Sequence, residues 1–257
     1  MRNVRLLVAY DGARFFGWQR QDGFDSVQQA LEEAVLASTG QRATVHGAGR
    51  TDTGVHALGQ VAHLHIDTRL TDDRLRHATN AHLPAGVVVR EAETCDDQFH
   101  ARFSAISKRY AYQVVTSRFQ PAFGATHAHW LAWPLDVPRM RREARVLVGR
   151  HDFAAFGNTG SPRATTVRTV QHLRLVARRE RFFFVIQGDG FLYNMVRTIA
   201  GTLIDVGRGR LEEGACARAL ASGQRDDAGM TAPAAGLHLV SVQYPERIFA
   251  GRYRGLS

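Results

Sequence analysis

The loop over residues 47–57 places one carboxylate, Asp52, among glycines and a single arginine, Arg50. Strand-like residues precede it at 44–47, and the alternating apolar and polar segment 60–66 follows it. A polar loop between two strands presents its side chains at the end of a sheet, where a rigid scaffold meets solvent. The pattern predicts carboxylate chemistry at Asp52. The alternative is that Asp52 is a turn residue kept for its local hydrogen bonds.

The glycines of this loop do not form a nucleotide-binding motif. The dinucleotide fingerprint needs a third small residue where Asp52 stands and a helix after the loop, whereas a strand-like segment follows here. No glycine-rich loop of the chain leads into Gly-Lys-Ser or Gly-Lys-Thr, so a phosphate-binding P-loop is also excluded.

Composition limits the class of protein. A chain of 257 residues with 44% hydrophobic residues can form one large domain or two of ordinary size. It contains no run of about 18 apolar residues and no secretory leader, so we expect a cytoplasmic protein without a membrane span. Its two cysteines, Cys95 and Cys216, form no CxxC motif, which excludes a disulfide scaffold and a thiolate zinc site.

The formal net charge of +9 predicts a polyanionic partner such as nucleic acid. Lys108 is the only lysine among 33 basic residues. Arginine suits bidentate phosphate contacts and stacking on bases. A GC-rich genome would produce the same preference, so the inference depends on the sign of the charge and not on the choice of arginine.

Periodicity predicts an α+β chain whose two halves have approximately the same order of elements. The first half is expected to hold strands at 5–10, 44–47, 60–66 and 87–90, with helices from Ser26 to Gly40 and near 72–80. The second is expected to hold strands at 108–116, 167–176, 181–187 and 237–243, with helices from Asp136 to Gly149, at 192–206 and near 211–220. We therefore expect two α+β subdomains, 1–105 and 106–257, each a mainly antiparallel sheet backed by helices.

Several motifs occur together in a recognisable order. The segment Gly49-Arg50-Thr51-Asp52-x-Gly54-Val55-His56-Ala57 resembles the signature of the tRNA pseudouridine synthase A family, with Thr53 where that family often has alanine. Further segments resemble the same family along nearly the whole chain: Tyr10-Asp11-Gly12 with Phe16-Gly17-Trp18-Gln19-Arg20, Phe99-x-Ala101-Arg102-Phe103-Ser104-Ala105, Lys108-Arg109-Tyr110, Gly149-x-His151-Asp152-Phe153, Gly190-Phe191-Leu192-Tyr193-Asn194-Met195-Val196-Arg197, and Ala232-Pro233-x-x-Gly236-Leu237.

The resemblance implies the pseudouridine synthase fold, with two sheets joined around a basic cleft and Asp52 at its floor as the catalytic carboxylate. It implies that Tyr110 stacks on the target base, that Arg197 keeps the carboxylate anionic, and that Arg50 holds a base flipped out of its helix. Leu237 would pack under the pocket. By pattern alone, Tyr110 is a core residue, Arg197 a solvent-facing helix charge, and Arg50 a partner of Asp52 itself.

The implied activity is isomerisation of uridine to pseudouridine in the anticodon stem-loop of tRNA, at positions 38 to 40. The implied enzyme is a homodimer that needs no cofactor. A noncatalytic RNA-binding or chaperone protein would share the charge but would not require Asp52, Tyr110 and Arg197 together. A metal-dependent phosphohydrolase would need a second carboxylate, and Asp11, Asp67 and Asp189 stand in no ligand motif.

No metal site is expected. The tightest histidine pairs, His63-x-His65 and His127-x-His129, each suggest one face of a strand, without a cysteine or carboxylate at ligand spacing. His56 belongs to the Asp52 loop, where a structural or RNA-facing role suits it better than that of a base. Two further arginines, Arg163 and Arg168, are candidates for phosphate contacts, with solvated surface charge as the alternative.

Overall fold

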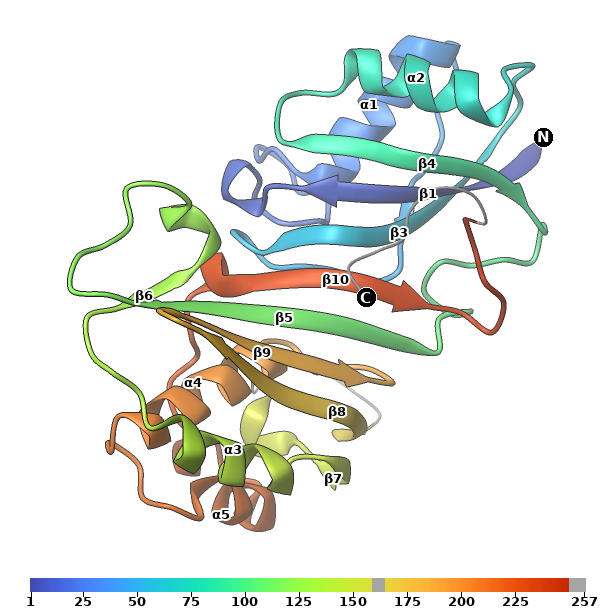
Figure 1. Ribbon diagram of the computed structural model, residues 1–257. Coiled ribbons are helices and arrows are strands. Elements are labelled where there is room, and N and C mark those ends of the chain that lie inside the picture. Colours follow the sequence, from blue (N-terminus) through green and yellow to red (C-terminus); the bar gives the residue numbers. More distant parts are fainter. Residues whose placement is uncertain (159–164, 250–257) are drawn as a thin grey trace. The chain divides into compact units, whose positions relative to one another are not determined.

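The computed structural model describes residues 1–158 and 165–249, and these form an α+β protein of two compact units (Figure 1). The first unit contains residues 1–106 and the chain from Leu239 onward, and the second contains residues 107–238. The expected division assigned everything after residue 105 to the second half. The two divisions differ in the last strand. It lies near the end of the sequence, but it joins the sheet of the first unit. Arg163 lies outside the described residues.

The sheet of the first unit is built on antiparallel pairing of its N-terminal strand. That strand pairs with the strand after the Asp52 loop, with Leu6 opposite Ala62, and also with a strand near residue 90. The strand order of this part of the sheet is β4 (Val87–Cys95), β1 (Arg2–Tyr10), β3 (His56–Ile66) and β10 (Leu237–Gln243). The short strand β2 (His46–Gly47) pairs with β3. The predicted strand over 44–47 is therefore only two residues long.

Two helices, α1 (Val27–Thr39) and α2 (Asp72–His82), accompany this sheet and pack against each other (Figure 1). Ser26 begins α1 by accepting the Gln29 backbone N–H, and Gly40 ends it with a φ of 72°. The Gln29 side chain donates to Glu33 Oε1 at 2.8 Å. The apolar stripe predicted for α1 is fully buried, as Val27, Leu31, Ala34 and Val35.

The strands of the second unit have the order β5 (Ser107–Thr116), β9 (Arg181–Gly188), β8 (Val167–Arg178) and β7 (Gly149–Asp152), with β6 (His129–Leu131) parallel to β5. Strands β8 and β9 form the predicted hairpin, and Arg179 takes a left-handed φ of 53° at its turn. The helices of this unit are α3 (Val137–Val146), α4 (Met195–Gly207) and α5 (Ala215–Ser222). Short 3-10 helices occupy Gly12–Arg14, Ala125–His127, Ala154–Phe156, Arg225–Asp227 and Ala234–Gly236.

Three predicted helix boundaries in the second unit were wrong. Helix α3 ends at Val146, and Gly149 instead opens β7 with a φ of 121°. Helix α4 begins at Met195 because Asn194 takes a left-handed φ of 63°, which an α-helix does not accommodate. Helix α5 begins at Ala215, after Gly214 with a φ of 87°.

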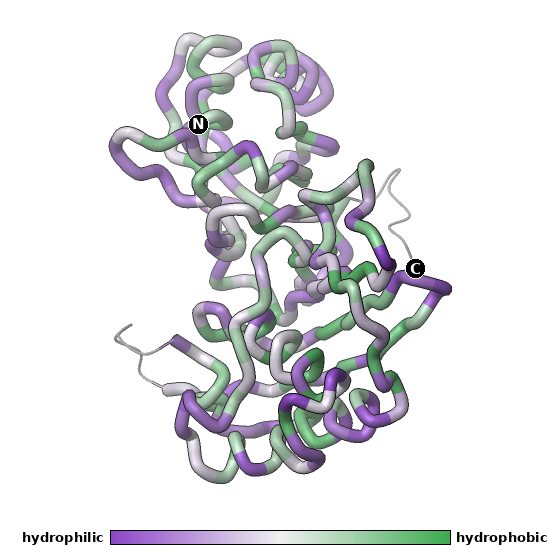
Figure 2. The backbone as a smooth tube through the Cα atoms, turned by 90° about the vertical axis from the view of Figure 1, so that its left-hand side faces the viewer, coloured by the Kyte–Doolittle hydropathy of each residue, from purple (hydrophilic) through white to green (hydrophobic). Residues whose placement is uncertain are grey.

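No helix within the described ranges 1–158 and 165–249 has both the length and the apolar character needed to cross a membrane. Figure 2 shows hydrophilic and hydrophobic stretches alternating along the chain.

The first unit contains a cluster of histidines around His63, which is only 3% exposed. The His63 Nδ1 accepts the Ala101 backbone N–H at 3.2 Å, and its ring lies 4.5 Å from that of His100 and 5.1 Å from that of His46. Burial, together with the neighbouring His100, His46 and His65, lowers the pKa of His63 from 6.5 to about 4. His63 is therefore a neutral, hydrogen-bonded core residue.

We expect this histidine to make stability depend on pH. Between pH 6.5 and about pH 4 the unfolded chain binds a proton at this position and the folded chain does not, so stability falls as the pH falls. The full loss is about 3 kcal/mol. In His63→Asn the amide oxygen can still accept the Ala101 N–H, so denaturant unfolding should show a shallower pH slope in this window. An unchanged slope, or an equal change in the exposed neighbour His65→Asn, would contradict this assignment.

Candidate active site

Asp52 lies half-buried in a turn between β2 and β3. Its carbonyl accepts the Val55 N–H at 3.1 Å, and Gly54 takes a φ of 80° within that turn. The turn interpretation is thus correct for the backbone. A turn at the start of β3 also fixes where the Asp52 side chain leaves the backbone.

The segment after β1 packs closely on this turn. Gly12 approaches so near that an added Cβ would overlap the Val55 carbonyl. Gly17 has a φ of 86°, and its Cβ would lie 2.6 Å from the Thr51 carbonyl oxygen, which also accepts the Trp18 N–H at 3.0 Å. The Tyr10-Asp11-Gly12 and Phe16-Gly17-Trp18 motifs are therefore supports for the Asp52 loop.

Buried polar contacts hold the loop from beneath. The Tyr10 hydroxyl lies 2.7 Å from the Thr51 hydroxyl, and burial raises the pKa of Tyr10 to about 12, so the phenol remains protonated. The fully buried Gln60 donates its side-chain N–H to the Gly49 carbonyl at 2.8 Å. Because an unmade buried hydrogen bond is costly, these contacts resist displacement of the loop.

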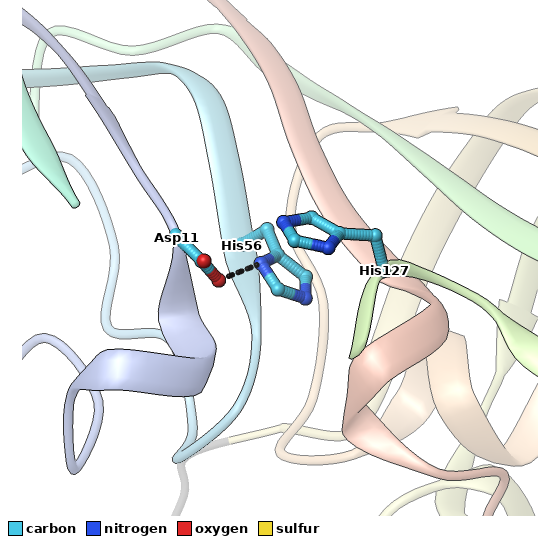
Figure 3. Close-up of side chains that lie close together, drawn as sticks. All are labelled: Asp11, His56 and His127. Atoms are coloured by element: carbon cyan, nitrogen blue, oxygen red, sulfur yellow. Dashed lines mark ion pairs between the residues drawn. The ribbon is translucent and has the colours of Figure 1, made fainter. Parts of the chain in front are cut away.

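His56 anchors the same region and is 2% exposed. Its Nδ1 lies 3.1 Å from Asp11 Oδ1 (Figure 3). The same Nδ1 lies 3.1 Å from the Gly12 backbone nitrogen. A single Nδ1 either donates to the carboxylate or accepts the N–H, and both arrangements tie the 3-10 helix Gly12–Arg14 to the start of β3. Of the two roles considered for His56, the burial supports the structural one. His127, drawn in the same figure, belongs to the second unit.

Arg50 is exposed and donates through Nε to Gln19 Oε1 at 3.0 Å. The described contacts of Arg50 include no ion pair with Asp52, so the alternative in which the two residues pair is wrong. Gln19 belongs to the segment that supports the loop and is itself bonded to Gln28 of α1.

In the second unit, Tyr110 lies on β5 with 8% exposure, and its ring meets Phe191 edge-on at 5.3 Å. Tyr112 is fully buried and donates its hydroxyl to the Pro233 carbonyl at 2.9 Å. Burial raises the pKa of Tyr112. Both tyrosines are therefore buried, and Tyr112 is a core residue with its phenol bonded to backbone.

Arg197 stands in the first turn of α4, nearer the start of the helix than the predicted range 192–206 implied. It is the one residue of this 13-residue helix that is not buried. Its Nε donates to the Ala232 carbonyl at 2.8 Å, and its Nη1 donates to Asn194 Oδ1 at 2.9 Å. Two hydrogen bonds therefore hold the guanidinium of this partly exposed side chain.

The motif around Pro233 connects these residues. Ala232 holds Arg197 and Pro233 holds Tyr112, while an added Cβ at Gly236 would lie 2.6 Å from the Tyr112 ring. Leu237 follows directly and is 6% exposed. The second unit thus positions Tyr110, Arg197 and Leu237, and the first unit positions Asp52 and Arg50.

Sequence reasoning missed the residues that hold Arg197 in place. Asn194 bonds it directly, and Gly201 lets the segment before Pro233 cross α4, because an added Cβ there would overlap the Met230 carbonyl. A glycine inside an apolar helical period was the available signal for such a close approach.

Of the histidine pairs, His127 lies in a 3-10 helix, so His127 and His129 do not share a strand face.

We predict that Gly201→Ala unfolds more readily than wild type. The new methyl group must displace the Met230 backbone from α4, at a cost of about 1–3 kcal/mol or more. Thermal and denaturant unfolding measure this cost. Gly190→Ala is the matched control, because its Cβ would meet only the Arg168 side chain at 3.6 Å. Equal stability of the two variants would show that the Met230 backbone does not pack tightly on α4 at Gly201.

Comparison with known proteins identifies the family. A family model described as tRNA pseudouridine synthase matches residues 6–104 and 144–245, which is more than half of the chain. The chain belongs to the tRNA pseudouridine synthase family. It is 43% identical over 244 residues to tRNA pseudouridine synthase A of Acetivibrio thermocellus, covering 95% of this chain and 100% of that one. It is 44% identical over 245 residues to tRNA pseudouridine synthase A of Rhodopseudomonas palustris strain BisB5, with the same coverage.

Membership of this family makes the protein an isomerase that acts on tRNA. It also agrees with the α+β architecture expected from the sequence. Among solved structures, a Cbf5-Nop10-Gar1 complex matches with a TM-score of 0.39 and 10% identity, over 92% of this chain and 48% of that one. A likeness this weak carries no argument.

Proposed function

We propose that this tRNA pseudouridine synthase acts on the anticodon stem-loop, at positions 38 to 40, with Asp52 as its catalytic carboxylate. The reaction detaches uracil from C1′ of its ribose, turns the base, and rejoins it through C5. Substrate and product are isomers, so the chemistry requires no cofactor. The observation that carries the proposal is the rigid mounting of Asp52, whose turn is fixed by close glycine contacts and buried hydrogen bonds.

A carboxylate can serve this reaction in three ways. It can attack C1′ of the sugar, attack C6 of the base, or assist removal of the proton at C5. In each case the carboxylate must be ionised and held in position before the substrate arrives. Pre-positioning of this kind lowers the entropic cost of reaching the transition state.

We propose substrate-binding roles for Arg50, Tyr110, Arg197 and Leu237. Tyr110 offers a flat ring and a phenol, which suit stacking on a base and proton transfer. Arg197 supplies a cation that would keep a nearby carboxylate ionised. Arg50 is exposed beside Gln19 and suits contact with a flipped nucleotide, and Leu237 offers an apolar surface under the base.

Charge and composition support the remaining parts of the proposal. The net charge of +9 favours recognition of tRNA through its phosphates and overall shape. Both cysteines are free thiols, which suits a reducing cytoplasm. We propose that the enzyme works there as a homodimer. Sedimentation of the free protein tests the dimer directly.

Position mapping tests the choice of anticodon stem-loop. Three tRNA transcripts would each keep a single uridine at 38, 39 or 40, and a fourth would keep uridines only outside the anticodon arm. Carbodiimide adducts detected by primer extension mark each pseudouridine formed. We expect product in the first three transcripts and none in the fourth. Product in the fourth alone would overturn the anticodon assignment, and tight binding without product would favour the noncatalytic RNA-binding alternative.

A further inference from the structure

An exposed tryptophan beside two arginines forms a small hollow in the second unit. This surface, hereafter the Trp133 site, is an open hollow of about 260 Å³ lined by Trp133, Pro134, Arg208 and Arg210. We propose that the Trp133 site binds an unpaired nucleotide of the RNA, with its base stacked on Trp133 and its phosphate against the arginines. The inference rests on the proposed function in that the ligand is the tRNA substrate.

Trp133 has the chemistry of a stacking platform. It is 58% exposed, whereas Trp18 is 2% exposed. The Arg208 guanidinium lies over the indole at 5.2 Å from the ring centre. A base carries a π face and a nearby anionic phosphate, so an exposed ring with an adjacent cation matches both parts of one nucleotide.

The loop that carries Trp133 is joined to the end of α4 by a backbone hydrogen bond. The Asp136 N–H donates to the Gly207 carbonyl at 2.9 Å, which ties the loop carrying Trp133 to the end of α4. Gly207 is also needed for this approach, since an added Cβ would lie 2.5 Å from Met140 Sδ in α3. Arg208 then caps α4 with its own N–H on the Ile204 carbonyl.

The Trp133 site is distinct from the residues that hold Arg197. Arg197 and Arg208 stand at opposite ends of α4, about 17 Å apart along its axis. The carboxyl end of a helix favours a cation, so Arg208 is stabilised at its position. A tRNA is large enough to contact both ends of the helix at once.

Two arginines, Arg208 and Arg210, supply the positive charge that would meet a phosphate at the Trp133 site. Arg210 lies 4.0 Å from Asp205, whose other carboxylate oxygen accepts the Met230 N–H. Asp136 accepts the Arg139 backbone N–H as the cap of α3. Burial and the nearby Arg208 lower the pKa of His129, and Asp205 opposes this shift.

The direct test is the affinity for an unmodified tRNA transcript, measured with labelled tRNA for four variants. Trp133→Ala should weaken binding about five- to one-hundred-fold, while Trp133→Phe, which keeps a stacking ring, should stay close to wild type. Arg208→Ala should reduce the salt dependence of binding by about one released ion. Phe123→Ala is the matched control, because Phe123 is 91% exposed in the same unit but lies outside the Trp133 site.

Fluorescence gives a second readout that does not depend on the alanine variant folding. The tRNA transcript should quench the wild-type emission and protect it from acrylamide, and this change should be smaller in Trp133→Phe, which keeps only Trp18 and Trp130. Wild-type affinity in Trp133→Ala, or quenching of the same size in Trp133→Phe as in wild type, would overturn the proposal. So would unchanged tRNA affinity with altered sedimentation of free Trp133→Ala, which would make this surface a contact between copies of the chain.

The result is separable from the fate of the proposed function. Weakened binding in Trp133→Ala by a protein that forms no pseudouridine would support the Trp133 site and contradict the proposed chemistry. Normal pseudouridine formation with unchanged binding in Trp133→Ala would contradict the Trp133 site alone.

Discussion

Replacing Asp52 with asparagine is expected to reduce pseudouridine formation by at least about 10³-fold, because the amide has the shape of the carboxylate but neither its charge nor its basicity. The turn should survive, since the supporting contacts involve the backbone of residues 51–55 and the Thr51 hydroxyl. Affinity for tRNA should stay close to that of wild type. Nucleoside chromatography of tRNA under single-turnover conditions measures the loss, and binding of labelled tRNA measures the affinity.

A matched control for this result is Asp22→Asn, which removes an exposed carboxylate from the same unit. It should form pseudouridine at the wild-type rate. Comparable turnover in Asp52→Asn and Asp22→Asn would remove Asp52 from the chemistry. Loss of tRNA binding in Asp52→Asn would assign it a role in binding instead.

Arg197→Ala is expected to lower the single-turnover rate by about 10²–10³-fold, the range found when a pre-positioned electrostatic group is removed. The Arg197 guanidinium donates hydrogen bonds to the Ala232 carbonyl and to Asn194 Oδ1. Arg197 is the only residue of α4 that is not buried. Arg197→Lys should recover little of the rate, because an ammonium group lacks the planar fork that makes both contacts. Truncation should also cost about 1 kcal/mol of stability through the lost hydrogen bonds.

Arg174→Ala separates this effect from a general loss of positive charge. Arg174 is exposed on β8 in the same unit, so its removal lowers the net charge equally. We expect this variant to lose a little tRNA affinity and to keep its rate at saturating tRNA. A rate for Arg197→Ala that matches Arg174→Ala would reduce Arg197 to one basic residue among many.

Helices and strands with local signals were predictable from the sequence. Ser26 and Gly40 are the N-cap and C-cap of α1, and both were predictable because capping depends on residues within one turn. The start of α4 was not predictable, because its apolar period continues backward through Leu192 while Asn194 breaks the helix with a left-handed φ. Assignment of β10 to the first unit also lay beyond local reasoning, since strand pairing over long sequence distances is set by tertiary packing.

In the candidate site, too, some features were predictable from the sequence and others were not. The motif of the Asp52 loop was visible in the sequence, but the packing of Gly12 and Gly17 on that loop was not. Likewise Arg197 could be singled out, whereas its contacts with Ala232 and Asn194 depend on segments that meet only in the fold. A pattern indicates which residue types could do chemistry, and the packing around them indicates which side chains are held in place.

Tritium release is the most direct measurement of the central claim that this enzyme isomerises uridine through Asp52. Forming the new bond at C5 displaces the C5 hydrogen, so tRNA carrying 5-tritiated uridine reports each turnover. Wild type and Asp52→Asn would be compared at equal folded concentration. We predict release by wild type, in proportion to the pseudouridine formed, and none by Asp52→Asn. No release from either protein, with tight tRNA binding retained, would contradict the account.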